Sequence, residues 1–447
     1  MNLKKMFVLL ILIFCIGAGA WFLVVRMERE APTLSFEEEL KYIGKSTEWK
    51  FSARDRKSGL RQLRVWVRQG PEMVVAFAED LPASDWRARG GEGSREVSLT
   101  FDPRALGLAE GAATVIVAAQ DNSLWSFKGN STFREFPVVI DMLPPRIDLL
   151  STTHNVKKGG TGLVVFRLNE EPESAVVEVG EVFFPAYPEE GGGDGVYVAY
   201  FAVPHDAEKS LKFSLTARDG AGNEMRRTFP TRILGAKFPR DTIRVSDGFL
   251  ERKVPEFQSM DSSLDTNLLQ AYLTVNREWR QKNHDRIREV CAVSAPRRLW
   301  SGSFMQMKNT KNMSAYAVRR TYLYNGKVVD KQVHLGLDLA STAGAPVPAG
   351  NGGTVAFADQ LGIYGQTVIL DHGQGIFSLY SHLSGLAVAA GEQVERGQEV
   401  GFSGQTGMAG GDHLHFSLLV SGEFVNPIEW LDDHWIADNI DNKLSIF

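Results

Sequence analysis

An uninterrupted apolar run lies near the N-terminus of the chain. Residues 6–25 carry no charge, and they are flanked by Lys4 and Lys5 on one side and by Arg26 on the other. A helix of ~20 apolar residues spans the ~30 Å hydrocarbon core of a bilayer. We therefore predict a cytoplasmic tail and a transmembrane anchor in residues 1–30, with the two lysines on the inner side.

Two other kinds of signal compete for the same run. A cleaved signal peptide would end at small residues such as those of "GAGAW", but its apolar region is usually shorter, and here the run continues from Trp21 to Val25. A lipoprotein signal at Cys15 is less well supported, because the bulky Phe14 precedes it where a small residue is expected. An uncleaved, single-pass anchor is the favoured interpretation.

After the anchor, short segments alternate apolar and polar residues or are apolar throughout, as strands of half-buried sheets do. They are residues 60–67, 94–101, 113–121, 162–168, 174–179, 195–203 and 211–219. The prolines of "LPP" (143–145) divide them into two sets, because tandem prolines do not fit a central strand. The sets echo each other, since "VAAQDNSLWSF" and "LTARDGAGNEM" are each a strand that ends in an Asp-containing polar turn.

This spacing predicts two β-sandwiches of ~100 residues each. One covers residues 31–142 and the other covers residues 143–234. Both are similar to immunoglobulin-like modules. A role as rigid spacers is the simpler interpretation of these modules, and ligand binding is the alternative.

Helical spacing replaces this pattern in residues 262–290. Apolar side chains recur there at Leu264, Leu268, Tyr272, Leu273 and Trp279. Ser262 or Ser263 is suited to cap the N-terminus. We predict one amphipathic helix, or two with a break near Asn283, inside a helical connector of residues 235–299.

The apolar side of this helix must be buried on another surface. One interpretation is a packing helix that joins two domains, and the other is a helix that covers the groove of the domain that follows. His284 lies in a charged stretch, and we predict that it is solvated.

The composition narrows the function only a little. The 447 residues are 43% hydrophobic and 23% charged, with a net charge of −5, which is ordinary for a globular chain of several domains. A concentrated basic face is absent, so we expect no nucleic-acid partner. The two cysteines, Cys15 and Cys291, predict no disulfide, and exported domains would be stabilised by their cores.

Chemistry-bearing residues collect after residue 300. His334 and Asp338 lie in "KQVHLGLDLAS", and His382 lies in "LYSHLS". His413 and His415 are two positions apart, so they share one face of a predicted strand. A catalytic zinc site needs three protein ligands and an open position. His334, Asp338 and one histidine of the 413/415 pair supply them, which leaves His382 and the other histidine for proton transfer near neutral pH.

Three stretches resemble the signature blocks of the lysostaphin-type (LytM-like) zinc metalloendopeptidases, in the order that this family has. They are "HLGLDLAS", "YGQTVILDHGQGIFSLYSHLS" and "GQTGMAGGDHLHFSLLVSGEFVNPIEWLD", within residues 300–432. The resemblance implies that His334, Asp338 and His415 bind one Zn²⁺ per catalytic domain and that His382 and His413 are catalytic. Gln366 and Gln374 replace a frequent Asn, but they lie in turns, so no ligand is put in doubt.

The resemblance also implies a duplicated-hybrid-motif β fold for a zinc metallopeptidase domain in residues 300–447. The whole chain is then mainly β: an N-terminal transmembrane helix, two immunoglobulin-like β-sandwich modules, a helical connector and a C-terminal metallopeptidase domain. It would lie in the bacterial inner (cytoplasmic) membrane, with the domains after Arg26 on the periplasmic or extracellular side.

The implied function is a membrane-anchored zinc metalloendopeptidase that hydrolyses peptide cross-links of bacterial peptidoglycan through a metal-activated water. Its partners would be peptidoglycan and, through the N-terminal helix, the membrane. The alternative is a non-catalytic activator of a cell-wall amidase with the same fold. Such relatives typically lose metal ligands, whereas this chain keeps all five positions, so the enzyme is favoured.

Overall fold

The computed structural model describes residues 3–82, 93–125 and 128–446. These residues form two compact units. The first contains residues 1–144 and the turn Asp219–Asn223, and the second contains residues 145–218 and 224–447.

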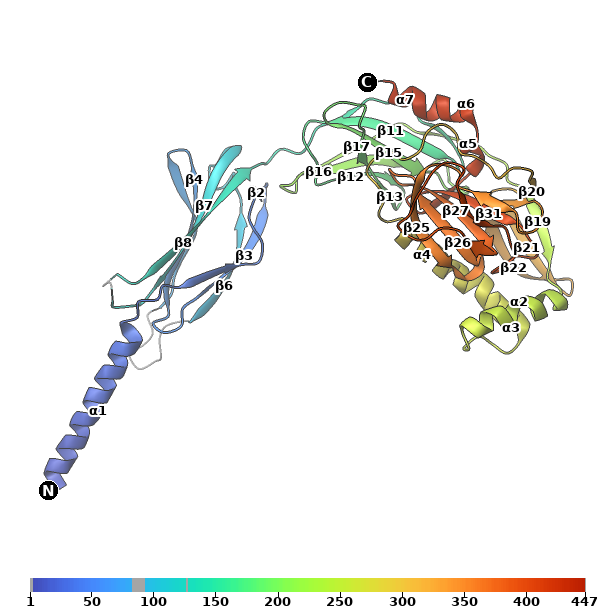
Figure 1. The fold of residues 1–447 in the computed structure, drawn as a ribbon. Coiled ribbons are helices and arrows are strands. Elements are labelled where there is room, and N and C mark those ends of the chain that lie inside the picture. The colour runs from blue at the N-terminus through green and yellow to red at the C-terminus, as the bar shows by residue number, and fades with distance from the viewer. Residues whose placement is uncertain (1–2, 83–92, 126–127, 447) are drawn as a thin grey trace. The chain divides into compact units, whose positions relative to one another are not determined.

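The first unit begins with helix α1 (Leu3–Arg26), drawn in blue in Figure 1. Its residues Lys5–Val24 are long and apolar enough to cross a membrane, and none of them is buried inside the protein. An apolar helix that no other element covers is suited to a lipid environment, and a signal sequence has the same length and composition.

A β-sandwich follows α1. Its three-stranded sheet has the order β1 (Thr33–Phe36), β3 (Thr47–Arg54), β6 (Ser94–Phe101). Its five-stranded sheet has the order β2 (Tyr42–Ile43), β8 (Ser131–Ile140), β7 (Gly111–Asp121), β4 (Leu60–Gln69), β5 (Glu72–Asp80). The core lies between the sheets, where the Trp49 ring packs 5.2 Å from that of Phe36 and 5.1 Å from that of Phe136. The strands predicted in this part of the chain are confirmed.

The second unit starts with two further sheets, each of four strands. One has the order β14 (Tyr187–Pro188), β15 (Val196–Ala202), β11 (Thr161–Leu168), β9 (Ile147–Leu149). The other has the order β13 (Val182–Pro185), β12 (Ser174–Val179), β16 (Phe213–Arg218), β17 (Glu224–Thr228). The short strands β10 (Asn155–Lys157) and β18 (Arg232–Leu234) pair in parallel beside them. The strands predicted between residues 162 and 219 are thus confirmed.

Three helices follow, and they differ in part from the prediction. They are α2 (Asp247–Met260), α3 (Leu268–Thr274) and α4 (Arg280–Val290), with a π-helical turn at Val275–Trp279 joining the last two. The predicted start and break are wrong: the side chain of Asn267, not Ser262 or Ser263, caps α3, and the irregularity precedes Asn283. Helix α2 was not predicted, because Pro255 lies inside it.

The prediction that His284 is solvated is also wrong. Its ring is half-buried, with Nε2 3.1 Å from the hydroxyl of Tyr364 and the ring centre 5.2 Å from that of Phe424. Burial lowers the pKa of His284 to about 4, so the imidazole is neutral and packs like an aromatic core residue.

The rest of the second unit is built on an eight-stranded sheet. Its order is β20 (Lys311–Ser314), β23 (Leu337–Ala340), β31 (Leu414–Val420), β27 (Ile376–Leu383), β26 (Gln366–Asp371), β25 (Gly353–Gln360), β29 (Gln393–Val394), and β32 (Glu423–Val425) pairs with β31. Two small sheets flank it: β24 (Pro346–Pro348), β30 (Glu399–Phe402), β28 (Gly385–Leu386), and β19 (Arg240–Arg244), β21 (Val318–Tyr324), β22 (Lys327–His334).

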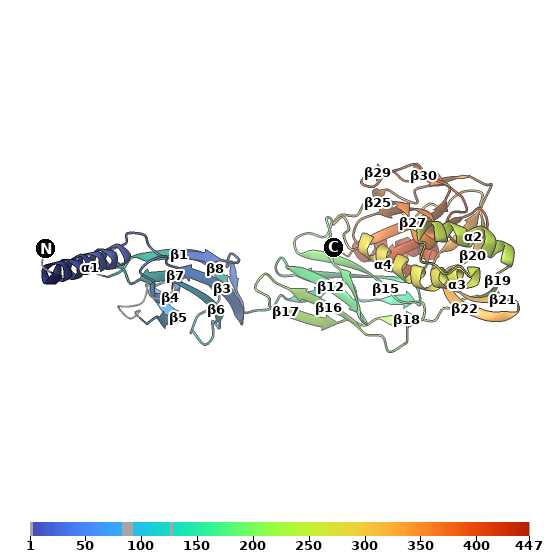
Figure 2. The same ribbon diagram turned by 90° about the horizontal axis from the view of Figure 1, so that it is seen from below.

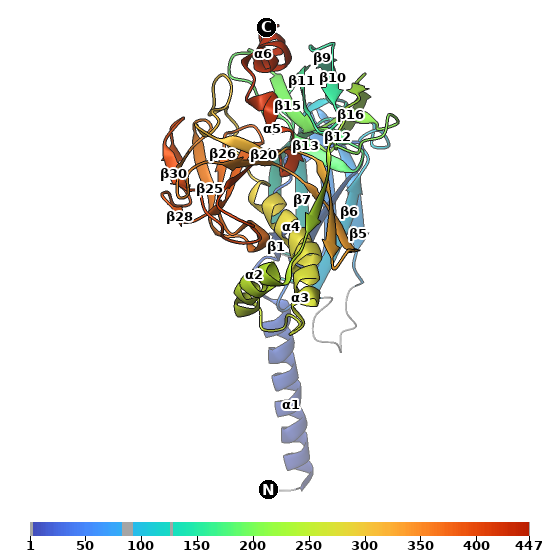
Figure 3. The same ribbon diagram turned by 90° about the vertical axis from the view of Figure 1, so that its right-hand side faces the viewer.

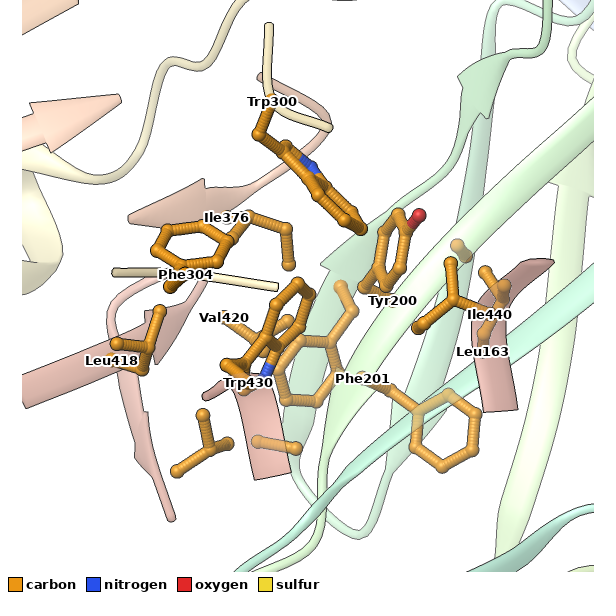
Figure 4. Packing of buried hydrophobic residues seen from close by; sticks show 14 of the residues in the cluster. Leu163, Tyr200, Phe201, Trp300, Phe304, Ile376, Leu418, Val420, Trp430 and Ile440 are labelled. Carbon is orange, nitrogen blue, oxygen red and sulfur yellow. The ribbon is translucent and has the colours of Figure 1, made fainter. Parts of the chain in front are cut away.

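The central strands are buried on both faces, which explains their continuous apolar runs. Ile369, Phe377 and Leu419 point to one face and pack with side chains of α2, α3 and α4, which lie along the sheet in Figures 2 and 3. Their neighbours in sequence point to the opposite face. That face shares one core with β11 and β15, and the ring of Tyr200 in β15 packs 6.1 Å from that of Trp430 in the C-terminal segment (Figure 4).

The C-terminal segment closes this second core. It contains α5 (Pro427–Trp430), α6 (Asp433–Ile436) and α7 (Asn442–Leu444). The indole N–H of Trp430 donates to the hydroxyl of Thr161 at 3.0 Å, and the backbone N–H of Thr161 donates to the Glu429 carboxylate at 2.9 Å. Residues more than 260 positions apart in sequence therefore form one packed interface.

Candidate functional site

A cluster of three side chains lies where the edge of the eight-stranded sheet meets β22. His334 ends β22, Asp338 lies in β23 and His415 lies in β31. Asp338 and His415 are direct partners in the antiparallel ladder, so the strand pairing itself brings them together. Gly336, between the first two residues, allows the backbone to approach β31 closely. A Cβ at this position would lie 2.6 Å from the carbonyl oxygen of Phe416.

The ligand atoms of this cluster converge. His334 Nε2, Asp338 Oδ1 and His415 Nδ1 lie 2.9 Å from one another. The three residues are nearly inaccessible, with exposed fractions of 6%, 9% and 5%. Two imidazole nitrogens and one carboxylate oxygen are a donor set that zinc prefers.

Neighbouring groups fix the tautomers of the two histidines. His334 Nδ1 lies 2.9 Å from the carbonyl oxygen of Ala315, which can only accept, so Nδ1 carries the proton. The Ser417 hydroxyl donates to the carbonyl of Leu335 and therefore accepts from His415 Nε2 at 3.1 Å. His334 Nε2 and His415 Nδ1 therefore carry lone pairs that face the Asp338 carboxylate. Neither nitrogen can donate a hydrogen bond to the carboxylate, whereas a cation bound between the three groups would accept all of these lone pairs.

Arg320 holds the other oxygen of the carboxylate. Its guanidinium donates to Asp338 Oδ2 at 2.8 Å and to the Ser314 hydroxyl at 2.8 Å. Burial works to raise the pKa of Asp338, but the neighbouring imidazoles, His334 first and then His413 and His415, hold it well below its usual range. Asp338 is therefore ionised over the whole physiological pH range.

His382 and His413 stand beside the cluster, with ring centres 4.9 Å apart. The Nδ1 of His382 lies 2.9 Å from the carbonyl of Thr406, and that of His413 lies 2.8 Å from the carbonyl of Gly411. Each Nδ1 is thus a donor, which leaves Nε2 of each ring for the site. His413 Nε2 lies 3.5 Å from Asp338 Oδ1.

Their surroundings shift the two pKa values in opposite directions. Burial, with the neighbouring His413 and His415, lowers the pKa of His382 well below its usual value. Burial opposes protonation of His413 too, but its hydrogen bond to the Asp338 carboxylate and the charge of that carboxylate raise the pKa. A pair of neighbouring groups with pKa values pushed apart is suited to hold one proton acceptor and one proton donor. His382 also has φ 63°, a left-handed conformation that is uncommon for non-glycine residues.

These five residues line a cleft of about 450 Å³. Its other walls come from β19 and β21, from the helices α2, α3 and α4, and from residues 408–410. Three tyrosines and four arginines contribute to the lining: Tyr272, Tyr322, Tyr364, Arg244, Arg252, Arg280 and Arg320. In a protein with a net charge of −5, this concentration of arginine favours a substrate that carries carboxylates.

All five residues expected at the site are brought together, although their sequence positions span residues 334–415. Arg320 was missed, because an arginine in an alternating strand resembles any surface position of a sheet. The covering role of the helix predicted at residues 262–290 stays a prediction, since α3 and α4 form part of the cleft wall and also pack on the sheet.

The part of the chain that contains this site is similar to known proteins. Residues 332–427 match the model of peptidase family M23. The DD-carboxypeptidase/endopeptidase Mpg of Neisseria meningitidis is 39% identical over 97 residues, which are 22% of this chain and 22% of that protein. The murein hydrolase activator EnvC of Escherichia coli is 36% identical over 96 residues, which are 22% of this chain and 23% of that protein.

The match thus spans about a fifth of the length of these curated relatives. Among solved structures, the catalytic domain of the antimicrobial peptidase lysostaphin from Staphylococcus simulans is 28% identical, with a TM-score of 0.25, over 29% of this chain and 98% of that domain.

Proposed function

We propose that this chain, whose residues 332–427 form a domain of peptidase family M23, is a membrane-anchored zinc metalloendopeptidase that hydrolyses peptide cross-links of bacterial peptidoglycan. The observation that carries the proposal is the convergence of His334 Nε2, Asp338 Oδ1 and His415 Nδ1, with two further histidines beside them. An endopeptidase among the similar proteins supports the reaction class.

His334, Asp338 and His415 would hold the ion. When bound, Zn²⁺ in such a site polarises a carbonyl oxygen and lowers the pKa of water to ~7. Arg320 orients the carboxylate through its hydrogen bond to Oδ2. The carbonyl of Ala315 and the hydroxyl of Ser417 keep both imidazoles in the ligand tautomer.

His382 and His413 would move protons. The low pKa of His382 leaves its Nε2 free to accept a proton from the attacking water. The raised pKa of His413 favours a protonated Nε2, which would donate a hydrogen bond to the developing oxyanion and then a proton to the leaving amine. Tyr364, buried beside His415 with ring centres 5.7 Å apart, limits access of other water.

The second candidate function is activation of a cell-wall amidase, and the likeness to a murein hydrolase activator supports it. The presence of all five histidine and aspartate residues, three of them with ligand atoms 2.9 Å apart, favours the enzyme. A protein that only binds a partner has no need for two further histidines beside the cluster, each with its Nδ1 held by a carbonyl oxygen.

Digestion of purified peptidoglycan by the zinc-loaded full-length protein tests the proposal. We expect new amino and carboxyl termini within the peptide cross-links, and loss of this activity when a chelator removes zinc. An activator would instead produce no new termini alone and would stimulate an added amidase.

In a separate test of the anchor, helix α1 should keep the protein in membranes through high-salt and alkaline washing, whereas a mature N-terminus near Trp21 would show cleavage.

A further inference from the structure

Three carboxylates outside the catalytic cleft are buried together in the first compact unit. Glu28 follows α1, Asp55 follows β3, and Asp121 ends β7. Their exposed fractions are 4%, 6% and 0%. One oxygen of each lies within 4.8 Å of the others.

Part of this cluster is satisfied by the surrounding chain. The backbone N–H and the hydroxyl of Ser58 donate to Glu28 Oε1 at 2.9 and 2.6 Å, and the backbone N–H of Asn130 donates to Asp121 Oδ1 at 2.6 Å. The second oxygen of Glu28, Oε2, is buried and has no hydrogen-bond partner among the residues described. An unpaired carboxylate oxygen in the interior is costly, and two neighbouring carboxylates increase the cost.

The electrostatics agree with this geometry. Burial raises the pKa of Glu28, the hydrogen bonds from Ser58 oppose the rise, and the charges of Asp55 and Asp121 add to it. Arg29, the cation next to Glu28 in sequence, has its guanidinium carbon 4.1 Å from the ring centre of Trp125. A bound cation would remove the repulsion and give Glu28 Oε2 a partner.

We propose that Glu28, Asp55 and Asp121 bind a calcium ion. The donors are all oxygen, which excludes the nitrogen and sulfur sets that zinc favours. Calcium accepts irregular sets of oxygen ligands at ~2.3–2.6 Å, so that two ligands of one ion lie up to ~5 Å apart, whereas Mg²⁺ requires a near-ideal octahedron at ~2.1 Å. Oxygens that lie within 4.8 Å of one another, as in this cluster, can share one calcium ion.

The ion would stiffen the joint between the membrane helix and the first β module. Asp55 belongs to the end of a strand in the three-stranded sheet, and Asp121 belongs to the end of a strand in the five-stranded sheet. Glu28 lies in the segment between α1 and β1. One ion therefore connects both sheets of the sandwich to the chain that leaves the membrane helix.

Calcium binding to the full-length protein in detergent tests this site. The protein is dialysed free of calcium, kept saturated with zinc and titrated with CaCl₂ by calorimetry, and its thermal unfolding is followed at each concentration. We expect binding with a Kd at or below the ~10⁻³ M of weak extracellular sites, and a melting temperature that rises with calcium. Glu28→Gln should weaken binding about tenfold or more, since even outer partners of a metal contribute ~10–100-fold.

The exposed Glu72→Gln is the matched control and should bind calcium like the wild type. His334→Ala should also bind calcium normally, which separates this site from the catalytic one. Absence of heat and of thermal shift up to about 10 mM calcium, well above the weakest such sites, would overturn the proposal. So would unchanged affinity in Glu28→Gln, or equal binding of Mg²⁺ and calcium. Because Glu28 lies outside the strands, its variant should fold even where Asp121→Asn does not.

Discussion

Each histidine of the cleft has one ring nitrogen fixed by a neighbouring backbone or hydroxyl group. Carbonyl oxygens hold Nδ1 of His334, His382 and His413, and the Ser417 hydroxyl holds Nε2 of His415. The free nitrogens of His334, His415 and His413 lie 2.9, 2.9 and 3.5 Å from Asp338 Oδ1. These contacts fix which nitrogen of each histidine is available to the site, and so help to decide whether the residue can bind the metal or carry a proton.

Substitution of a ligand should remove metal and activity together. His334→Ala and His415→Ala each remove one of only three protein ligands, and Asp338→Asn removes the only anionic ligand. Zinc per chain, measured by atomic spectroscopy, should fall well below one in all three. The exposed His434→Ala is the control and should keep its zinc. Stoichiometric zinc in His334→Ala would show that the ligand assignment is wrong.

Substitution of a proton carrier should lower the activity without removing the zinc. His413→Ala should keep its zinc and lose ~10²–10⁴-fold in kcat, the usual contribution of general acid–base catalysis. At position 382, Asn is the better probe, because it tolerates the φ of 63°. A change of less than about threefold in kcat would remove the histidine concerned from the mechanism.

At the scale of elements, the sequence pattern predicted where the strands lie but not which strands pair with one another. Alternation located the strands of both β modules, and the order of the His and Asp motifs located the site. Helix α2 was hidden by Pro255, and the parallel pairing of β19 with β21 joins segments that share no local pattern. The echoed turns have a structural basis, because Asn130 Nδ2 donates to Asp121 at 2.8 Å and Asn223 Nδ2 donates to Asp219 at 3.0 Å.

Helix α2 is tied to the loop that orients His382. Lys253, 4% exposed in its side chain, donates from Nζ to the carbonyl of Gln405 at 2.6 Å, and the next residue, Thr406, holds His382. Lys253→Met keeps the apolar stem and removes the donor, so we expect a loss of about 1.5–3 kcal/mol in the free energy of unfolding. The exposed Lys282→Met is the matched control. Equal melting temperatures for both variants would exclude this tie.

At the scale of the whole molecule, the catalytic sheet is stabilised from both faces. The helices cover one face, and the face shared with β11 and β15 forms a common core with the C-terminal segment (Figure 4). Sequence periodicity shows that a strand is buried, but not which distant element buries it. This is why the shared core of residues far apart in the chain could not be predicted from the sequence.

Glu429 makes this shared interface sensitive to pH. Burial raises its pKa to about 7, against the hydrogen bond from Thr161 and the charge of Lys157. A carboxyl group with a raised pKa stabilises the fold fully below its unfolded value of 4.5, and the contribution is lost as pH rises through 7. The wild type should therefore lose up to about 3 kcal/mol relative to Glu429→Gln between pH 5 and pH 8.

Thermal unfolding of both proteins at several pH values measures this difference. Because the two chains are compared at each pH, any change in zinc binding at the lower pH cancels. The exposed Glu399→Gln is the control and should follow the wild type at every pH. A constant difference between the wild type and Glu429→Gln would show that Glu429 keeps an ordinary pKa.

The most direct test of the central claim is a count of the new amino termini that the zinc-loaded full-length protein releases from purified peptidoglycan. The wild type and His413→Ala are compared at equal zinc content. We expect termini within the peptide cross-links for the wild type and at least a ~10²-fold lower rate for the variant. Equal rates for the two proteins, or no termini from the wild type unless an amidase is added, would contradict it.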